Sequence, residues 1–238
     1  MVLADHDISP QDRDDRRRRD YPKGYGLTFP VADYRPWDID PEFLRLFEAV
    51  RAHTKLDVYR AYALYTLGQQ AAKTAGAVLE VGAWRGGSAA ILASVTQPRT
   101  VYVADTWQGV VKAGPRDDYY KGGEHADADI DTVEALFRSL GLSNYRLLSG
   151  IFPEESAERI EAEQIFSLVH IDVDVYQSAK DATEWVWPKL VVGGTVVYDD
   201  YGFYGCEGVT AYLHELMQDQ RMRVVANLNG QALAMKLC

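Results

Sequence analysis

The sequence predicts an α/β fold, in which helices cover both faces of a mostly parallel, seven-stranded sheet that ends in an antiparallel hairpin. Short runs rich in β-branched residues alternate with helical patterns from residue 77 onward, which is typical of parallel strands joined by crossover helices. These runs are almost continuously apolar, as expected for strands buried on both faces. Near the C-terminus, two strand-like runs are separated by Asn229-Gly230, a strong signal for a two-residue hairpin.

The N-terminal region precedes this alternation. Residues 1–20 mix Asp and Arg with almost no large apolar side chain, so we expect a mobile charged arm. Four arginines at 16–19 are flanked by aspartates, which favours a solvated tail over a nucleic-acid or localisation signal. Residues 21–238 are predicted to form a single domain, because no low-complexity linker divides them.

Within that domain, residues 21–75 are predicted to form a lid that is partly irregular and partly helical. The stretch 21–37 is rich in Tyr, Pro and Gly, which suits an irregular segment laid over a surface. Its large aromatic residues form either an apolar wall for a ligand or a packing strap: Tyr21, Tyr25, Phe29 and Trp37. Helical spacing begins at Asp40-Pro41, an N-cap followed by a first helical position, and a second helix is predicted over 57–74.

The remaining elements follow in alternation. Strands are predicted at 77–82, 100–105, 145–150, 166–174 and 193–200, with hairpin strands at 223–228 and 231–237. Helices are predicted at 87–96, 129–140, 154–163, 178–188 and 207–220. A chain that closes with a hairpin in this way fits a seven-stranded sheet better than the six-stranded, all-parallel sheet of dinucleotide-binding domains.

Composition and charge narrow the classes of function. The chain has 238 residues, of which 47% are hydrophobic, enough for one large domain. Lys and Arg number 25 against 35 Asp and Glu, so the net charge of −10 argues against nucleic acid or an anionic membrane as the main partner. No run approaches the ~20 apolar residues of a membrane helix, and we find no secretory h-region, so we expect a soluble, cytoplasmic protein.

A glycine-rich turn follows the first predicted strand. In the stretch 78–88, an apolar strand runs into a turn that opens a helix. Gly82 allows the backbone to approach a ligand closely, and Gly86 keeps the first helical turn, which includes Ser88, free of side-chain bulk. The glycine spacing is not G-x-G-x-x-G and no Walker motif occurs, which counts against NAD as the ligand.

Two acidic residues indicate a different cofactor. Glu80 lies within the first strand, and Asp105 closes the next, about 20 residues beyond the turn, where a carboxylate can accept hydrogen bonds from both ribose hydroxyls. A ligand with an amino group, a sulfonium and no phosphate suits this acidic cradle, so we expect S-adenosylmethionine. After the third strand, Ser149, Gly150 and Phe152 either contact its adenine ring or belong to the core.

Paired aspartates follow two neighbouring strands. Asp172 and Asp174 stand two apart after the fourth strand, where an extended backbone would project both to one side, and Asp199 and Asp200 end the fifth. Parallel strands would bring these four carboxylates to the edge of the sheet where α/β proteins bind ligands. Aspartates commonly cap turns, but a pair on each of two adjacent strands favours a hard cation such as Mg²⁺. Cys206 and Cys238 form no CxxC pair, so cysteine-ligated zinc has no support.

A cation beside a methyl donor indicates methyl transfer to a hydroxyl. That reaction needs an acceptor oxygen that is deprotonated or nearly so, because the displacement is in line at carbon. We predict Asp172, Asp199 and Asp200 as metal ligands, with Asp172 also facing the cofactor, and Asp174 as the base. His125, in a long polar loop, is the competing base because its ordinary pKa is near neutral.

The motifs together resemble a known family. LEVGAWRGG, VADTWQG, SGIFPE, IDVDVYQS and YDDYGFYGCEGV, in this order and spacing, resemble the macrocin O-methyltransferase-like family of metal-dependent sugar O-methyltransferases from antibiotic biosynthesis. The resemblance covers about residue 40 to the C-terminus. It implies a class I methyltransferase (Rossmann-like) fold, S-adenosylmethionine, Mg²⁺ held by the three aspartates named above, and the Asp174 base.

The same resemblance implies an acceptor and an assembly. The acceptor would be a sugar hydroxyl of a glycosylated small molecule, and the chain would form a homo-oligomer. Thr54 matches a family residue that touches the methionine part of the cofactor. The stretch 112–129 corresponds to a variable loop and matches no family pattern.

Three functions remain open at this point. The first is the metal-dependent sugar O-methyltransferase. The second is an O-methyltransferase acting on a catechol or another phenol, which would share the cofactor and the metal. The third is a non-catalytic scaffold of the same fold, which four clustered carboxylates disfavour because their mutual repulsion opposes folding.

Overall fold

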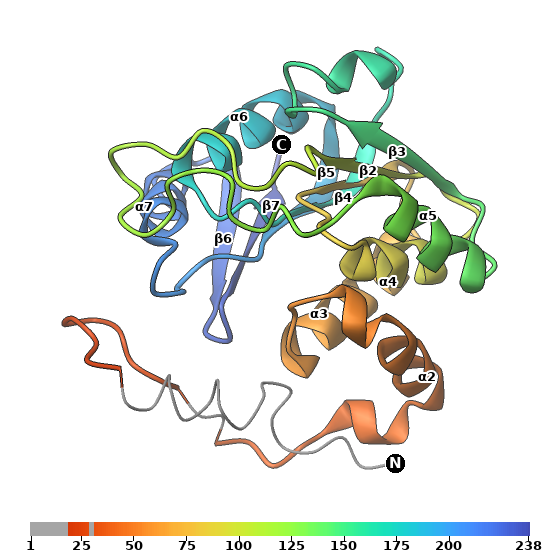
Figure 1. Cartoon of the computed structure of the whole chain (residues 1–238), viewed down its shortest axis with the longest axis horizontal. Coiled ribbons are helices and arrows are strands. Elements are labelled where there is room, and N and C mark those ends of the chain that lie inside the picture. Colours follow the sequence, from red (N-terminus) through yellow and green to blue (C-terminus); the bar gives the residue numbers. More distant parts are fainter. Residues whose placement is uncertain (1–18, 29–30) are drawn as a thin grey trace.

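The computed structural model describes residues 19–28 and 31–238, and one seven-stranded sheet forms its centre (Figure 1). Its strands are β1 (Ala77–Val81), β2 (Val101–Asp105), β3 (Tyr145–Ser149), β4 (Phe166–Ile171), β5 (Leu190–Tyr198), β6 (Met222–Asn227) and β7 (Gln231–Lys236). Their order across the sheet is β3-β2-β1-β4-β5-β7-β6, parallel except for β7, which pairs antiparallel with β5 and β6. The predicted α/β topology with a final hairpin is confirmed.

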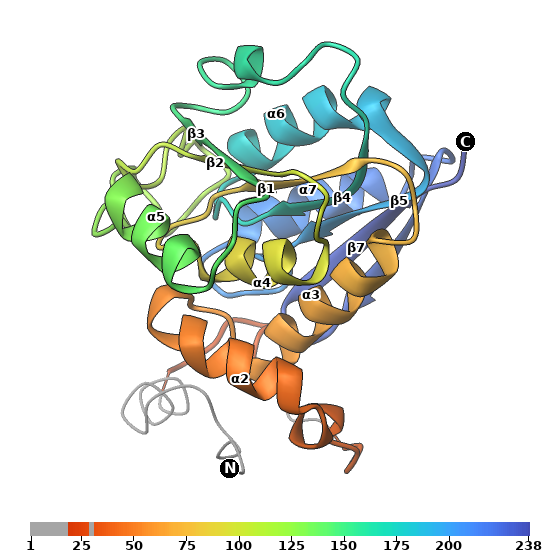
Figure 2. The ribbon, with the colours of Figure 1, turned by 90° about the vertical axis from the view of Figure 1, so that its right-hand side faces the viewer.

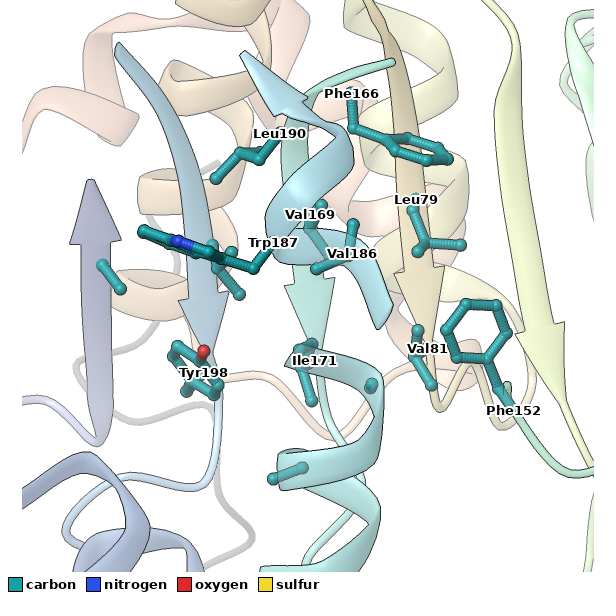
Figure 3. Close-up of a cluster of buried hydrophobic side chains, with 14 of the residues drawn as sticks. Leu79, Val81, Phe152, Phe166, Val169, Ile171, Val186, Trp187, Leu190 and Tyr198 are labelled. Carbon is teal, nitrogen blue, oxygen red and sulfur yellow. The ribbon is translucent and has the colours of Figure 1, made fainter. Parts of the chain in front are cut away.

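Helices cover both faces of this sheet (Figure 2). They are α2 (Pro41–Val50), α3 (Val58–Ala71), α4 (Gly87–Val95), α5 (Ile130–Ser139), α6 (Tyr176–Val186) and α7 (Glu207–Leu216). Two buried clusters follow from the period-two alternation of the strands. Val78 and Val103 contribute to the cluster that contains α2, α3, α4 and α5, whereas Leu79 and Tyr102 contribute to the one that contains α6 and α7. Figure 3 shows the second cluster, in which strand side chains such as Val169 lie under α6.

Side chains that precede the helices fix where they begin. The Asp40 carboxylate accepts hydrogen bonds from the first amides of α2, and Asp57 and Asp129 do the same for α3 and α5. Helix α6 receives its cap from elsewhere in the chain: the Tyr176 amide donates to the buried carboxylate of Asp117 at 2.9 Å. The loop 106–129 between β2 and α5 is therefore tied to the start of α6.

The register of the parallel strands determines which residues meet at their carboxyl ends. Ile171 pairs with Tyr198, so Asp172 and Asp199, the next residue of each chain segment, emerge side by side. The Asp199 amide donates to the carbonyl of Ile171 at 2.9 Å, so the hydrogen bonding between β4 and β5 continues one residue beyond the end of β5. On the other side of β4, Glu80 of β1 pairs with His170.

Several predicted elements have other bounds in the structure, such as the helix predicted at 207–220, which ends at Leu216, and two of the differences have a clear physical cause. The predicted helix 154–163 is only a short 3₁₀ turn, Ala157–Arg159, because the segment has too few apolar side chains to hold a helix against the sheet. The predicted strand 166–174 ends at Ile171. The amides of Val173 and Asp174 donate to the Asp200 carboxylate instead of continuing a ladder, and Asp174 adopts a left-handed backbone with φ of 66°.

The N-terminal segment divides between the core and the surface. Trp37 is buried and packs edge-on against Tyr59 at 5.1 Å, so it belongs to the core and not to a ligand wall. Tyr21 and Tyr25 instead contact Tyr204, outside the core. Phe29, and all but the last two residues of the predicted charged arm 1–20, lie outside the described residues. In the part of the chain that the structure describes, no helix combines the length and the apolar character needed to cross a membrane.

Candidate functional site

A cavity of about 400 Å³ opens at the carboxyl ends of β1, β2, β4 and β5. Every strand that borders it contributes a residue at or just beyond its last position. Its walls include most of the residues predicted for cofactor, metal and base: Thr54, Gly82, Ser88, Asp105, His125, Gly150, Phe152, Asp172, Asp174, Asp199 and Asp200. The topology thus gathers into one cavity residues that span most of the sequence.

The glycine turn brings backbone to the floor of the cavity. Gly82 has φ of 88°, and a Cβ there would lie 1.7 Å from the carbonyl oxygen of Asp172, so only glycine fits between β1 and the segment after β4. Gly86, the N-cap of α4, does not line the cavity. A Cβ at Gly86 would lie 2.8 Å from Val133, so this glycine allows α4 to approach α5.

The carboxylate that ends β2 is held rigidly. Asp105 accepts hydrogen bonds from the amides of Trp84, at 2.8 Å, and Trp107, at 2.7 Å, one on each oxygen. Burial raises the pKa of Asp105, and these backbone bonds oppose that rise. Each oxygen retains a lone pair, so the carboxylate can still accept from the hydroxyls of a ligand in the cavity.

Glu80 lies beneath the cavity and not on its surface. The side chain is fully buried, accepts a short hydrogen bond from the Ser88 hydroxyl, and has its second oxygen 3.1 Å from Nδ1 of His170. Ser88 lines the cavity, so its hydroxyl links Glu80 to the space that a ligand would occupy. Burial alone would lower the pKa of His170, but the carboxylates of Glu80 and Asp199 raise it well above its ordinary value.

Of the remaining residues predicted to bind the cofactor, some line the cavity and one does not. Gly150 and Phe152 line the cavity, whereas Ser149, at the end of β3, does not. Phe152 packs edge-on against Trp185 at 5.0 Å, which fixes its ring. Thr54 lines the opposite wall and is held in place because its hydroxyl accepts from the Leu56 amide at 3.1 Å.

The four predicted aspartates lie on the wall of the cavity formed by the ends of β4 and β5. One oxygen each of Asp172 and Asp199 lies within 4.8 Å of the other and of a His170 nitrogen. Asp174 and Asp200 form a similar group with the Cys206 sulfur. Burial, and then the negative charges of neighbouring carboxylates, raise the pKa values of Asp172 and Asp200 well above the ordinary range. Clustered, buried oxygen donors of this kind are what a hard divalent cation requires.

Asp199 differs electrostatically from its neighbours. Its carboxylate accepts from the Arg60 guanidinium and, at 2.8 Å, from the Gln231 amide. Burial alone would raise the pKa of Asp199, but the charges of Arg60 and His170 lower it below the ordinary value. Sequence reasoning missed Arg60, His170 and Gln231. Arg60 lies 139 residues before Asp199, on α3, and no sequence motif marks that distance.

The two predicted bases approach one another through Tyr120. His125 lines the cavity with Nε2 3.4 Å from the Tyr120 hydroxyl and Nδ1 2.5 Å from the Lys55 amine. The Tyr120 hydroxyl also bonds to the Asp174 carboxylate, which offsets part of the rise that burial causes in the pKa of Asp174. His125, predicted from the sequence as the competing base, and Tyr120, which no sequence signal marked, both reach the cavity on the loop 106–129.

Comparison with known proteins shows which family the chain matches. Residues 59–227 match the family of macrocin O-methyltransferases (TylF). An 8-demethyl-8-(2,3-dimethoxy-α-L-rhamnosyl)-tetracenomycin-C 4′-O-methyltransferase of Streptomyces olivaceus is 30% identical over 194 residues, 74% of this chain and 72% of that protein. The mycinamicin III 3″-O-methyltransferase of Micromonospora griseorubida is 29% identical over 184 residues, 68% of this chain and 70% of that protein.

Solved structures show the same fold. The O-methyltransferase NovP has a TM-score of 0.67 at 23% identity, covering 78% of this chain and 83% of NovP. The calicheamicin methyltransferase CalS11 has a TM-score of 0.62 at 17% identity, covering 91% of this chain and 99% of CalS11. The fold is that of class I methyltransferases, whose cofactor is S-adenosylmethionine. With the family match over residues 59–227, it follows that this chain is an O-methyltransferase and belongs to the macrocin O-methyltransferase (TylF) family.

Proposed function

We propose that this enzyme transfers a methyl group from S-adenosylmethionine to a sugar hydroxyl of a glycosylated natural product, with Mg²⁺ or a similar cation held by its aspartates. One observation carries the proposal: Asp105 and the four clustered aspartates line the same cavity. A methyl donor held by Asp105 and an acceptor held near the aspartates would then lie next to each other. The relatives, named for methylation of rhamnosyl-tetracenomycin and of mycinamicin, support a glycosylated acceptor.

The part of the cavity near Asp105 would orient S-adenosylmethionine. Asp105 would accept from both ribose hydroxyls, while the Gly82 backbone and Thr54 would contact the methionine part. Gly150 and Phe152 would contact the adenine ring from the β3 side. Because backbone amides fix both Asp105 oxygens before any ligand enters, little side-chain entropy is lost on binding.

The part of the cavity near the four aspartates would hold the cation and take the proton of the acceptor hydroxyl. A bound divalent cation would lower the pKa of the acceptor hydroxyl and fix its direction of attack. Asp172 and Asp199, whose oxygens lie within 4.8 Å of each other, would hold that cation together with Asp200 from the neighbouring group, and Arg60 would keep Asp199 ionised for this purpose. Asp174 would take the hydroxyl proton, with the Tyr120 hydroxyl bond orienting its carboxylate. His125 is the alternative base, in contact with the same Tyr120 hydroxyl.

Three measurements test the proposal in order. Calorimetry with S-adenosylmethionine should show binding, and its absence at high protein concentration would favour a scaffold. Product mass spectrometry over glycosylated natural products and simple phenols should show a gain of one methyl group on a sugar. Methylation of phenols alone would assign the catechol-type alternative. Chelation of divalent cations should stop turnover while cofactor binding remains.

A further inference from the structure

A group of large side chains, which we call the apolar rim, lies beside Tyr204 of the cavity wall and the segments next to it. We use this name for six side chains: Tyr21, Tyr25, Leu27, Tyr119, Tyr204 and Leu228. They come from the N-terminal segment 19–28, from the loop 106–129, from the segment before α7 and from the β6–β7 turn. Figure 1 shows the N-terminal segment in red passing near the tip of the hairpin.

Tyr204 joins the rim to the cavity. It lines the cavity wall yet leaves 43% of its surface exposed. The rings of Tyr21 and Tyr25 meet it edge-on, with centroids at 5.7 and 5.6 Å. Three tyrosine rings therefore continue the cavity wall outward, and edge-on contacts hold them in place without any ligand.

Tyr119 and the β6–β7 turn that carries Leu228 lie against side chains that line the cavity. The Tyr119 ring packs edge-on at 5.2 Å against Tyr120, which lines the cavity, and Tyr119 remains 67% exposed. The hairpin turn lies against Phe203, another cavity residue, since a Cβ at Gly230 would be 2.1 Å from its ring. Leu228 in that turn is 78% exposed.

Leu27 completes the rim on the side of the hairpin. The Thr28 hydroxyl, next to Leu27 in the chain, donates to the carbonyl of Leu228 at 3.4 Å. This bond brings the N-terminal segment and the hairpin turn together. Large apolar side chains left exposed beside a ligand cavity, instead of buried in a core, indicate a surface that binds an apolar group.

The charges near the rim restrict that group further. The Glu207 carboxylate lies beside Tyr25 and adds to the rise that burial causes in the pKa of the Tyr25 hydroxyl. The aspartate cluster lies on the inner wall, and the chain carries a net charge of −10. Arg19 lies over the rings of Tyr21 and Tyr204, at 6.0 and 5.7 Å from their centroids. Because the carboxylates of Glu207 and of the aspartate cluster outnumber the Arg19 guanidinium here, an uncharged aromatic group fits better than the diphosphate of a nucleotide sugar.

We infer that the apolar rim binds the aglycone of the acceptor, as an apolar aromatic ring system stacked against Tyr204, while the attached sugar reaches inward to the aspartates. The inference rests on the proposed function, because it assigns the aglycone of that same glycosylated acceptor. It makes Tyr204 a specificity-determining residue, one that selects glycosides with a flat apolar aglycone.

Binding calorimetry on the full chain with S-adenosylhomocysteine and Mg²⁺ tests the inference. The probes are 4-methylumbelliferyl α-L-rhamnoside, methyl α-L-rhamnoside and TDP-rhamnose, which share a sugar and differ in what it carries. The wild-type protein should bind the umbelliferyl glycoside about 10-fold more tightly than the methyl glycoside, the gain expected of one good aromatic contact. Tyr204→Ala should remove this preference, and Tyr204→Phe, which keeps the ring, should retain it.

Tyr34→Ala is the matched control, because Tyr34 is a tyrosine with 70% exposure beside Tyr62 of α3 and outside the rim. It should leave the preference unchanged, and all variants should bind S-adenosylhomocysteine as the wild type does. The inference is wrong if the wild type shows no preference, if Tyr204→Ala keeps it, or if TDP-rhamnose binds most tightly. Failure of the proposed function has a different signature, which is the absence of methylated sugar in the product screen.

Discussion

The guanidinium of Arg60, on α3, donates to the carboxylate of Asp199, at the end of β5, and both side chains are buried. Arg60 also donates to Asp57 at 2.9 Å and to the Lys55 carbonyl at 2.9 Å, and it lies over the Phe203 ring at 4.7 Å. The ion pair thus provides the aspartate cluster with a fixed positive charge. It also ties the N-terminal helices to the carboxyl edge of the sheet.

Replacing Arg60 by methionine should destabilise the cation-free protein by about 3–5 kcal/mol, because the Asp199 charge would be left buried without its partner. Urea denaturation with a chelator present measures this change. Arg45→Met, at a residue of α2 outside the cavity, serves as the control and should cost little. If Arg60→Met lowers the free energy of unfolding by less than about 1 kcal/mol, other groups must compensate the negative charge of the aspartate cluster.

The stabilising effect of Mg²⁺ should grow with pH. The pKa values of Asp172 and Asp200 are raised in the folded protein, so folding is favoured below their unfolded values and loses that contribution as pH rises through the folded values. A cation that replaces the protons reverses the loss. Melting temperatures with Mg²⁺ and with chelator should therefore differ more at about pH 8 than at about pH 5.

The same experiment on Asp172→Asn separates this effect from a general influence of salt. This variant removes one charge from the cluster, so its cation-free form should lose less stability with rising pH than the wild type. Its response to Mg²⁺ should be smaller at every pH. An equal Mg²⁺ response of the wild type at both pH values would contradict a cation site on these carboxylates.

Asp174→Asn should lower kcat by about 100-fold or more, the range expected for loss of a general base. Cofactor affinity should stay near that of the wild type, and Mg²⁺ affinity should change little because Asp172 and Asp199, which lie in a different group of oxygens from Asp174, remain. Steady-state kinetics with titration calorimetry measures all three. Full activity of Asp174→Asn, together with inactivity of His125→Gln, would transfer the role of base to His125.

Gly82→Ala should abolish cofactor binding or folding, because the new Cβ would lie 1.7 Å from the Asp172 carbonyl oxygen. Gly141→Ala provides the matched comparison: Gly141 also has a positive φ, of 67°, but no atom lies within 4 Å of its added Cβ. It should cost only about 1 kcal/mol of backbone strain. Thermal melting and cofactor calorimetry on both variants distinguish the close approach from the strain, and similar losses would argue against the close approach.

The sequence alone determined the sheet, the hairpin and the acidic and glycine residues that line the cavity at the ends of the strands. Strand and helix periodicity, the Asn229-Gly230 turn and the position of Asp105 are local signals, set by the side chains of a few neighbouring residues. The carboxyl ends of the parallel strands could be located approximately, although β4 ends at Ile171 and not at 174, and parallel pairing then brings those ends to one edge. For that reason the clustering of Asp172 with Asp199 could be predicted without coordinates.

Only the tertiary structure decided which groups surround those carboxylates. The pairing of Arg60 with Asp199, the contact of Tyr120 with Asp174 and the cap that Asp117 gives to α6 each join segments far apart in the sequence. No periodic pattern encodes such contacts, because they depend on how helices and loops pack across the edge of the sheet. The apolar rim is of the same kind, since its side chains come from both ends of the chain and meet only in the folded protein.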